Sequence, residues 1–196
     1  MIRSLLIASL SIATLAACAA PDDSGPATSS GAIESPEGNE ARALMALVDE
    51  CSAGAPARSV TDLCVLSHDA MEGRLVGTPG NALAREYIIS RFQQIGLQPV
   101  GDSFEHPFSF QRRIDFRNPG SARETIHAVN LIARIPGADS SKVMAVTAHF
   151  DHVGPGENNE IYNGADDNAS GVAGLLAVAE HFMMNPPAHD VLIIAF

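Results

Sequence analysis

The fold of this chain is decided by residues 143–151, Val143-Met144-Ala145-Val146-Thr147-Ala148-His149-Phe150-Asp151. A near-continuous apolar run that ends in polar residues is typical of a strand buried on both faces. Residues 163–171, Asn163-Gly164-Ala165-Asp166-Asp167-Asn168-Ala169-Ser170-Gly171, then lead into an amphipathic helix expected over 168–182. A second buried strand follows over 191–196. Strand, loop, helix and strand form a βαβ unit, which predicts an α/β fold with a mixed, mostly parallel sheet and helices on both faces.

Apolar periodicity predicts further elements before this unit. We expect helices over residues 40–50, 60–68 and 81–95, and strands over residues 104–116 and 126–135. Ser59 or Thr61 is the expected N-cap of the second helix, and Gly96 is placed to end the third. The turn-rich stretch 71–80 separates these two helices, and we expect Glu72 and Arg74 to order it through an ion pair.

Composition sets the class of protein. The chain has 196 residues, 46% of them apolar and 18% charged, which is enough for one sizeable globular domain. Its net charge of -11 argues against binding to nucleic acid, because the phosphate backbone attracts basic surfaces.

The first residues resemble the signal peptide of a bacterial lipoprotein. Arg3 precedes an apolar segment, Leu5 to Leu15, which is too short to span a bilayer and ends in Leu15-Ala16-Ala17-Cys18. We expect a signal peptide over residues 1–17 and lipid modification of Cys18, which would anchor the exported protein to a membrane, with the outer membrane facing the periplasm as the expected site. An ordinary signal peptide with an incidental cysteine is the alternative. Residues 18–39 are rich in Pro, Ser, Gly and acidic residues and are expected to form a disordered tether.

Two cysteines remain in the expected folded part, residues 40–196. In an oxidising compartment, Cys51 and Cys64 are candidates for a disulfide. Both could instead be reduced core residues.

The polar residues after the first strand have the chemistry of a metal site. Ligands of open α/β sheets bind outside the carboxyl ends of the strands, where His149 and Asp151 lie. In an extended segment these two residues point the same way, so that one can bind a metal while the other orients it. A second ligand would come from Asp166 or Asp167, whose carboxylate could bridge two cations.

Each of these features also has an ordinary structural interpretation. A lone His-x-Asp is common on surfaces, and acidic residues before a helix often serve as its cap. Gly171 could simply permit close helix packing, and His152 could either approach substrate or lie idle on the surface. The combined order of strand, His-x-Asp, loop, Asp-Asp-Asn-Ala-Ser-Gly and helix favours the metal site.

On these motifs the chain resembles the co-catalytic dizinc exopeptidases of the bacterial leucyl aminopeptidase type, relatives of glutamate carboxypeptidase. The resemblance runs from about Leu66 to Phe196. The matching segments are His68-Asp69-Ala70-Met71-Glu72-Gly73-Arg74, Gly77-Thr78-Pro79-Gly80, Asn130-Leu131-Ile132-Ala133, Ala148-His149-Phe150-Asp151 and Gly164-Ala165-Asp166-Asp167-Asn168-Ala169-Ser170-Gly171.

The resemblance implies a role for each residue of the site. It makes His149 a ligand of one of two zinc ions, Asp151 its supporting partner and Asp167 the carboxylate that bridges the ions. It also implies a cis peptide bond between Asp167 and Asn168. The family's next motif, Gly-Glu-Glu, supplies the general base and another ligand, and these are expected after Phe196. We therefore expect residues 40–196 to be a partial catalytic domain that is inactive alone, with its final strand exposed at the edge of the sheet.

The resemblance implies a zinc-dependent aminopeptidase that hydrolyses peptide substrates with a water activated by two zinc ions. Two alternatives remain: an enzyme like glutaminyl cyclase, which shares the fold, and a metal-free binding module that has lost catalysis. Histidine and carboxylate ligands suit zinc but also suit manganese or cobalt.

Overall fold

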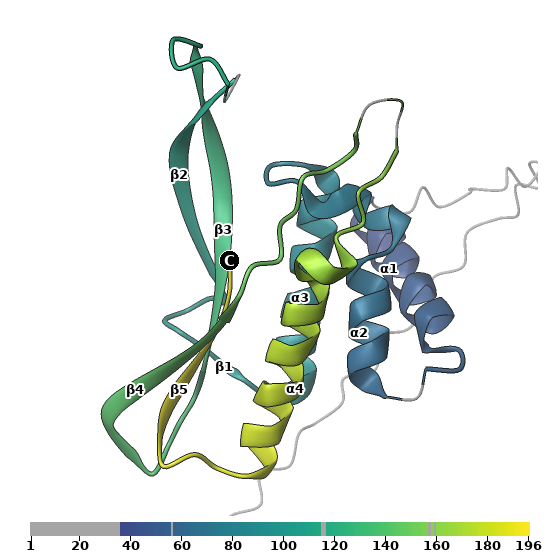
Figure 1. The fold of residues 1–196 in the computed structure, drawn as a ribbon. Helices are drawn as coiled ribbons and strands as arrows, with labels where there is room; N and C mark the ends of the chain where they lie inside the picture. Colours follow the sequence, from purple (N-terminus) through teal and green to yellow (C-terminus); the bar gives the residue numbers. More distant parts are fainter. Residues whose placement is uncertain (1–35, 56, 115–116, 157, 159) are drawn as a thin grey trace, which may run out of the picture. The chain divides into compact units, whose positions relative to one another are not determined.

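The computed structural model describes residues 36–196 except residues 56, 115–116, 157 and 159 (Figure 1). The expected signal peptide, Cys18 and most of the expected tether lie outside the described residues. Helix α1 (Pro36–Ser52) begins four residues before residue 40, where the first helix is expected from the sequence. None of the described helices is long and apolar enough to cross a membrane.

A five-stranded mixed sheet carries the site, and it confirms the mixed α/β fold. Its strands are β1 (Gln98–Pro99), β2 (Glu105–Arg113), β3 (Arg123–Ile135), β4 (Asp139–Ala148) and β5 (His189–Ala195). The order is β1-β3-β5-β4, and β2 forms a hairpin with the first part of β3. Only β4 and β5 pair in parallel, so antiparallel pairs outnumber parallel ones in the described sheet, contrary to the expected mostly parallel pairing.

The edge of the sheet is formed by β4 and not by the final strand. β5 lies between β3 and β4, and its apolar side chains are largely buried. On β4, by contrast, Val143 and Met144 are 58% and 47% exposed. The expectation that residues 142–148 are buried on both faces is therefore wrong, because α4 covers one face of β4 and nothing among the described residues covers its outer edge.

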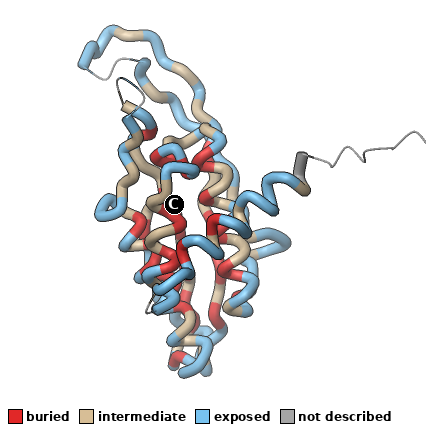
Figure 2. The backbone as a smooth tube through the Cα atoms, turned by 90° about the vertical axis from the view of Figure 1, so that its right-hand side faces the viewer, coloured by how far each residue is buried: buried red, intermediate tan, exposed pale blue. Residues whose placement is uncertain are grey.

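The other helices are α2 (Arg58–Leu66), α3 (Pro79–Ile95) and α4 (Ser170–Met184), with a short helical turn, η1 (Asp69–Arg74), between α2 and α3. Figure 1 shows the four α-helices on the same side of the sheet, so among the described residues helices cover one face and not both. α3 and α4 contact the strands, α2 packs on α4, and α1 packs on α2. Figure 2 shows the buried residues gathered in the interior of the described part of the fold. The far part of the β2–β3 hairpin is exposed or half-buried. The largest fully buried apolar side chains are Leu66, Met71, Tyr87, Ile88, Phe92, Leu131, Leu176 and Ile193.

Local capping explains where α3 begins and ends. The Thr78 side chain accepts a hydrogen bond from the backbone N–H of Asn81, and Pro79 occupies the first turn, where its missing N–H has no consequence. Gly96 ends the helix in the left-handed conformation, as its position predicts. The N-cap of α2 is Ala57, which makes no side-chain cap, so the expectation of Ser59 or Thr61 is wrong.

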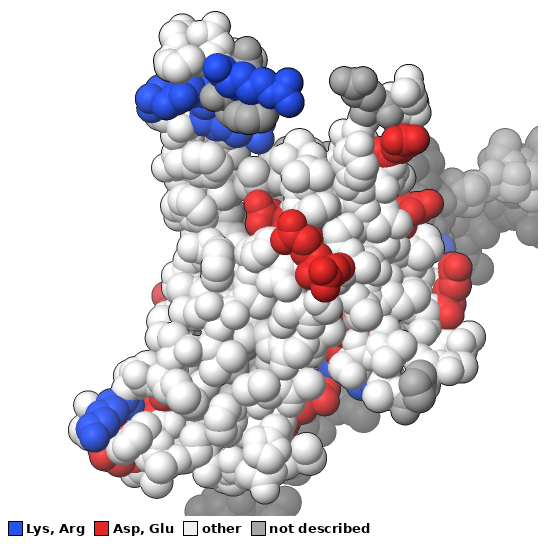
Figure 3. Space-filling view, viewed as in Figure 1, with Lys and Arg blue, Asp and Glu red and all other residues white. Residues whose placement is uncertain are grey.

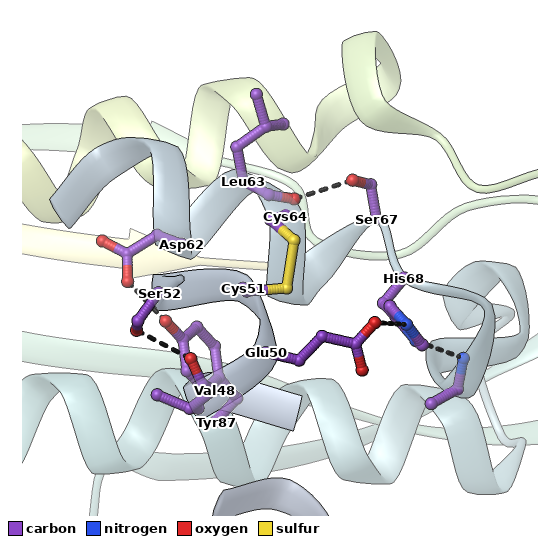
Figure 4. The surroundings of a disulfide bond; sticks show 11 residues. Val48, Glu50, Cys51, Ser52, Asp62, Leu63, Cys64, Ser67, His68 and Tyr87 are labelled. Carbon is purple, nitrogen blue, oxygen red and sulfur yellow. Dashed lines mark hydrogen bonds and ion pairs between the residues drawn. A yellow bond between two sulfur atoms is a disulfide. The ribbon is translucent and has the colours of Figure 1, made fainter. Parts of the chain in front are cut away.

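A disulfide joins α1 to α2. The structure links Cys51 to Cys64, the pairing considered from the sequence, with Cα atoms 5.7 Å apart (Figure 4). Beside it, the His68 imidazole lies 3.8 Å from the Glu50 carboxylate and accepts a hydrogen bond from the backbone N–H of Ala70. The bridge therefore joins the end of α1 to α2, and the contact between Glu50 and His68 joins α1 to the residue before η1.

Candidate metal centre

The carboxyl ends of two parallel strands meet at the candidate site. Ala148 at the end of β4 is paired with Ala195 at the end of β5. The pairing continues beyond both strands, because the Phe150 N–H donates to the Phe196 carbonyl at 2.8 Å and the Phe196 N–H to the Ala148 carbonyl at 3.1 Å. His149 is therefore held on a paired backbone at the sheet edge where the sequence analysis places it.

The second half of the site is the turn η3 (Ala165–Ala169), which leads directly into α4. Gly164 precedes it in the left-handed conformation, with φ of 57°. A Cβ atom on Gly164 would lie 2.5 Å from the carbonyl oxygen of Asp167 and 2.7 Å from the ring of His152. Only glycine allows the loop to approach the strand end this closely.

The Asn168 and Gly171 pair fixes the turn at the start of α4. The side-chain oxygen of Asn168 accepts a hydrogen bond from the backbone N–H of Gly171 at 3.1 Å. A Cβ atom on Gly171 would lie 2.2 Å from that oxygen, so glycine is needed here to admit the Asn168 side chain. The peptide bond between Asp167 and Asn168 is cis, as the resemblance implies.

Three predicted site residues converge in the structure. His149 Nε2 lies 3.2 Å from the Asp167 carboxylate, and His149 Nδ1 lies 3.3 Å from the Asp151 carboxylate. The imidazole thus has one nitrogen on each carboxylate, with Asp151 on the side away from the η3 turn. Of the two candidate aspartates it is Asp167 that faces His149, while the Asp166 carbonyl accepts a hydrogen bond from the Ser170 hydroxyl.

His152 also faces this point. Its Nδ1 lies 3.6 Å from the second oxygen of the Asp167 carboxylate, and its side chain is mostly buried. The sequence allows His152 either to approach substrate or to lie on the surface without a role in the site. The structure places it beside the candidate ligand Asp167.

The donor atoms fit a zinc ion in type and separation, but they are too few to complete its coordination. His149 Nε2 lies 3.2 Å from an oxygen of the Asp167 carboxylate, and imidazole nitrogen and carboxylate oxygen are ordinary zinc ligands. Zinc takes about four ligands. In the part of the chain that the structure describes, no three His, Cys, Asp or Glu side chains gather closely enough to hold a metal by themselves.

Arg74 is the functional candidate that the sequence analysis misassigned. Its guanidinium does not pair with Glu72; it donates to four backbone carbonyls, those of Leu66, Phe150, Asn163 and Gly164. Its side chain is fully buried. Desolvation lowers the pKa of Arg74, and the negative charges of Asp151 and Asp167 act in the opposite direction. In the sequence, the only sign of this role is that Arg74 lies between Gly73 and the glycine-rich segment 77–80.

A second buried arginine, Arg91, serves the helices and not the site. It donates to the Asp62 carboxylate at 2.7 Å and to Glu180 at 2.5 Å, and so ties α3 to α2 and α4. The Tyr87 hydroxyl donates to the same Asp62 carboxylate, and burial together with this bond raises the pKa of Tyr87. These contacts are structural and lie apart from His149.

The surface charge over the site is negative. Figure 3 shows acidic side chains gathered over the turn that leads into α4, without Lys or Arg between them on this face. Basic side chains are instead concentrated at the far end of the β2–β3 hairpin, in a stretch that contains Arg112, Arg113 and Arg123. A negative surface around a histidine and a carboxylate favours a cation at this site.

Comparison with known proteins agrees with this geometry. Residues 130–196 match the model of Peptidase family M28. The alkaline phosphatase isozyme conversion protein of Escherichia coli (strain K12) is 26% identical over 134 residues, which is 63% of this chain and 36% of that protein. The resemblance to the zinc exopeptidases is thus confirmed for the segment that contains the site, and it supports hydrolase chemistry of the peptidase type.

Two solved structures show the same fold. A glutaminyl cyclase from Fimbriiglobus ruber is similar with a TM-score of 0.55 and 21% identity, over 72% of this chain and 45% of that one. An aminopeptidase from Aneurinibacillus sp. strain AM-1 is similar with a TM-score of 0.54 and 14% identity, over 69% of this chain and 60% of that one. The chain spans about a third of the length of its curated relative and about half of these solved structures.

Proposed function

We propose that this chain provides the first half of the active site of a zinc-dependent exopeptidase, and that the whole enzyme is an aminopeptidase. The observation that carries the proposal is the convergence of His149 Nε2 and the Asp167 carboxylate at 3.2 Å, at the carboxyl ends of β4 and β5. The match of residues 130–196 to Peptidase family M28 covers both residues and supports it.

Each residue has a distinct part in this proposal. His149 and Asp167 would hold zinc, and Asp167 would be shared between two ions. Zinc in such a site supplies a Lewis acid that polarises the scissile carbonyl and brings the pKa of a water toward neutrality. Asp151 holds the other imidazole nitrogen, which fixes the ring and the tautomer that can ligate. His152 lies beside Asp167, where it can orient that carboxylate or meet the substrate.

The resemblance puts the general base, a glutamate, in a Gly-Glu-Glu segment after Phe196. We therefore propose that the chain alone is inactive and that hydrolysis requires the residues that follow, since the water needs a group to take its proton.

Glutaminyl cyclase activity is the second candidate, because the Fimbriiglobus ruber enzyme has the same fold. The fold does not separate the two, because an aminopeptidase shares it at nearly the same TM-score. The reactions differ in their products: hydrolysis consumes water and releases an amino acid, whereas cyclisation of an N-terminal glutamine releases ammonia. A metal-free binding module is a third candidate, which zinc binding would exclude.

We also propose that the protein is exported and anchored by lipid on Cys18 to the outer membrane, facing the periplasm. The support is the sequence Leu15-Ala16-Ala17-Cys18 after a short apolar segment. Mass spectrometry of the purified membrane fraction tests this, because an acylated Cys18 at the new N-terminus has a defined mass.

The function is tested by assaying this chain beside a polypeptide extended with the residues encoded after Phe196. With zinc, the extended protein is expected to release p-nitroaniline from aminoacyl p-nitroanilides, and the short chain is not. His149→Ala in the extended protein is expected to remove activity. His189→Ala is the matched control, since His189 is equally exposed and also faces a carboxylate, that of Asp139 at 3.4 Å, but lies at the opposite end of the sheet. Comparable turnover by the short chain, or ammonia release without amino-acid release, would contradict the proposal.

A further inference from the structure

We propose that Arg74 is a positioning residue that holds the two ligand-bearing segments of the site, the β4 end with His149 and the turn with Asp167, in register with each other. The inference rests on the proposed function only where it concerns zinc. Its structural part stands on the contacts of Arg74 alone.

The guanidinium joins segments that are far apart in the sequence. Its Nε donates to the carbonyl of Phe150, the residue between His149 and Asp151, at 2.7 Å. Its two terminal nitrogens donate to the carbonyls of Asn163 at 2.7 Å and Gly164 at 2.9 Å, directly before the η3 turn. One planar group therefore bridges the strand end and the loop.

The same group is fixed to the helical layer. One terminal nitrogen also donates to the carbonyl of Leu66, the last residue of α2. The site segments are thereby tied to the disulfide-linked helices as well as to each other. Arginine has five N–H donors in a rigid fork, and four interactions here use that fork.

The backbone around Arg74 forms a second set of ties to the same loop. The Arg74 carbonyl accepts from the His152 N–H at 3.2 Å, and the Gly73 carbonyl accepts from the Gly154 N–H at 3.0 Å. A Cβ atom on Gly73 would lie 2.6 Å from the carbonyl oxygen of Tyr162, so glycine is required where this segment meets the loop. Residues 73–74 are thus paired with 152–154 along their backbones.

Arg74 itself adopts an uncommon backbone conformation that its neighbours maintain. Its φ is 49°, in the left-handed region that side-chain-bearing residues seldom occupy. The Asn81 side-chain amide donates to the Arg74 carbonyl at 3.1 Å and holds this conformation from α3. Such strain persists where the surrounding contacts require it, and these contacts converge on the site.

The chemistry of the contacts requires arginine and not merely a positive charge. All four acceptors are neutral carbonyls that approach in different directions, and a lysine ammonium, a compact point charge with three donors, does not reproduce the planar fork. Arg74→Lys therefore keeps the charge near Asp151 and Asp167 and removes the geometry. This separates positioning from electrostatic effects on a bound cation.

The experiment compares Arg74→Lys, Asn81→Ala and the control Arg91→Lys in the full chain. Arg91 is buried like Arg74 but contacts Asp62 and Glu180, so its substitution weakens the fold away from the site. The first readout is amide hydrogen exchange without metal at Phe150, His152 and Ala169, corrected for each variant's global stability. The second is the dissociation constant for zinc, measured by competition with a chelator on the same substitutions in the polypeptide extended beyond Phe196, because the described residues supply too few ligands by themselves.

Arg74→Lys is expected to speed exchange at these three amides by about tenfold or more beyond the effect of its change in global stability. The reason is that local opening in this variant no longer has to break the hydrogen bonds of the guanidinium. Its zinc affinity is expected to fall by about 10- to 100-fold, as when other outer partners of metal ligands are removed. Asn81→Ala is expected to change both in the same direction by less, and it decides the question if Arg74→Lys does not fold. Arg91→Lys is expected to change neither.

Corrected exchange at the three amides that is the same in the Arg74, Asn81 and Arg91 variants would overturn the inference. Failure of the polypeptide extended beyond Phe196 to bind zinc would count against the proposed function, whereas the exchange measurement alone decides the role of Arg74.

Discussion

Gly171→Ala tests the local architecture of the metal site with a single added methyl group. In the structure its Cβ atom would lie 2.2 Å from Oδ1 of Asn168 and 2.6 Å from the rest of that amide. The Asn168 side chain has to move, and the hydrogen bond that it accepts from the Gly171 N–H is lost. Because Asn168 is bonded to Asp167, the candidate ligand is displaced as well.

The change in the free energy of unfolding combines one stabilising contribution with two destabilising ones. Replacing glycine with alanine in a helix stabilises by about 1 kcal/mol. The lost hydrogen bond costs about 1 kcal/mol, and the steric overlap adds about 1–3 kcal/mol. The expected net result is a loss of about 1–3 kcal/mol in the free energy of unfolding.

Gly174→Ala is the matched control on the same helix. Nothing lies within 4 Å of a Cβ atom at Gly174, so this variant is expected to gain up to about 1 kcal/mol. Urea unfolding followed by circular dichroism gives both values, and a chelator assay gives zinc affinity. If the two variants shift stability in the same direction by similar amounts, the close fit between Asn168 and Gly171 is not as described.

Three further predictions concern the scaffold. Replacing both Cys51 and Cys64 with alanine is expected to lower the free energy of unfolding by about 3 kcal/mol in thermal or urea unfolding, since the bridge closes a loop with a sequence separation of 13. The hydrogen bond from the Gly137 N–H lowers the pKa of Asp190 most, and the Arg134 guanidinium lowers it further. The stability that the ionised Asp190 carboxylate contributes is therefore present above the unfolded pKa of about 3.9 and is lost as the pH falls through the lower native pKa. Asp190→Asn is therefore expected to lower stability at neutral pH and to reduce its acid dependence, and parallel acid dependence of the two proteins would refute this. Val143→Lys is expected to slow aggregation, measured by light scattering, with little change in stability, because it charges the open edge of the sheet.

The sequence determines the βαβ unit and the convergence of its polar residues because both follow from local patterns. An apolar run that ends in His149 and a Gly-rich loop that ends in Asp167 place the two residues at the same strand ends. Gly96 and the pairing of Cys51 with Cys64 are likewise local in origin.

Properties that depend on distant partners could not be predicted. The apolar pattern of residues 143–148 is the same for a central strand and for an edge strand, and only the pairing of β5 between β3 and β4 shows which it is. The sequence predicts an ion pair between Arg74 and Glu72, two residues away. Its four acceptors are backbone carbonyls, which carry no side-chain signature in the sequence.

The central claim is that His149 and Asp167 bind one zinc ion between them. It is tested most directly by crystals of the polypeptide extended beyond Phe196, grown with zinc and measured at the zinc absorption edge. We expect an anomalous peak about 2.0–2.2 Å from both His149 Nε2 and an oxygen of Asp167, and the loss of that peak in His149→Ala. A well-ordered site in which these two side chains remain in direct contact, with zinc elsewhere or absent at saturating concentration, would contradict it.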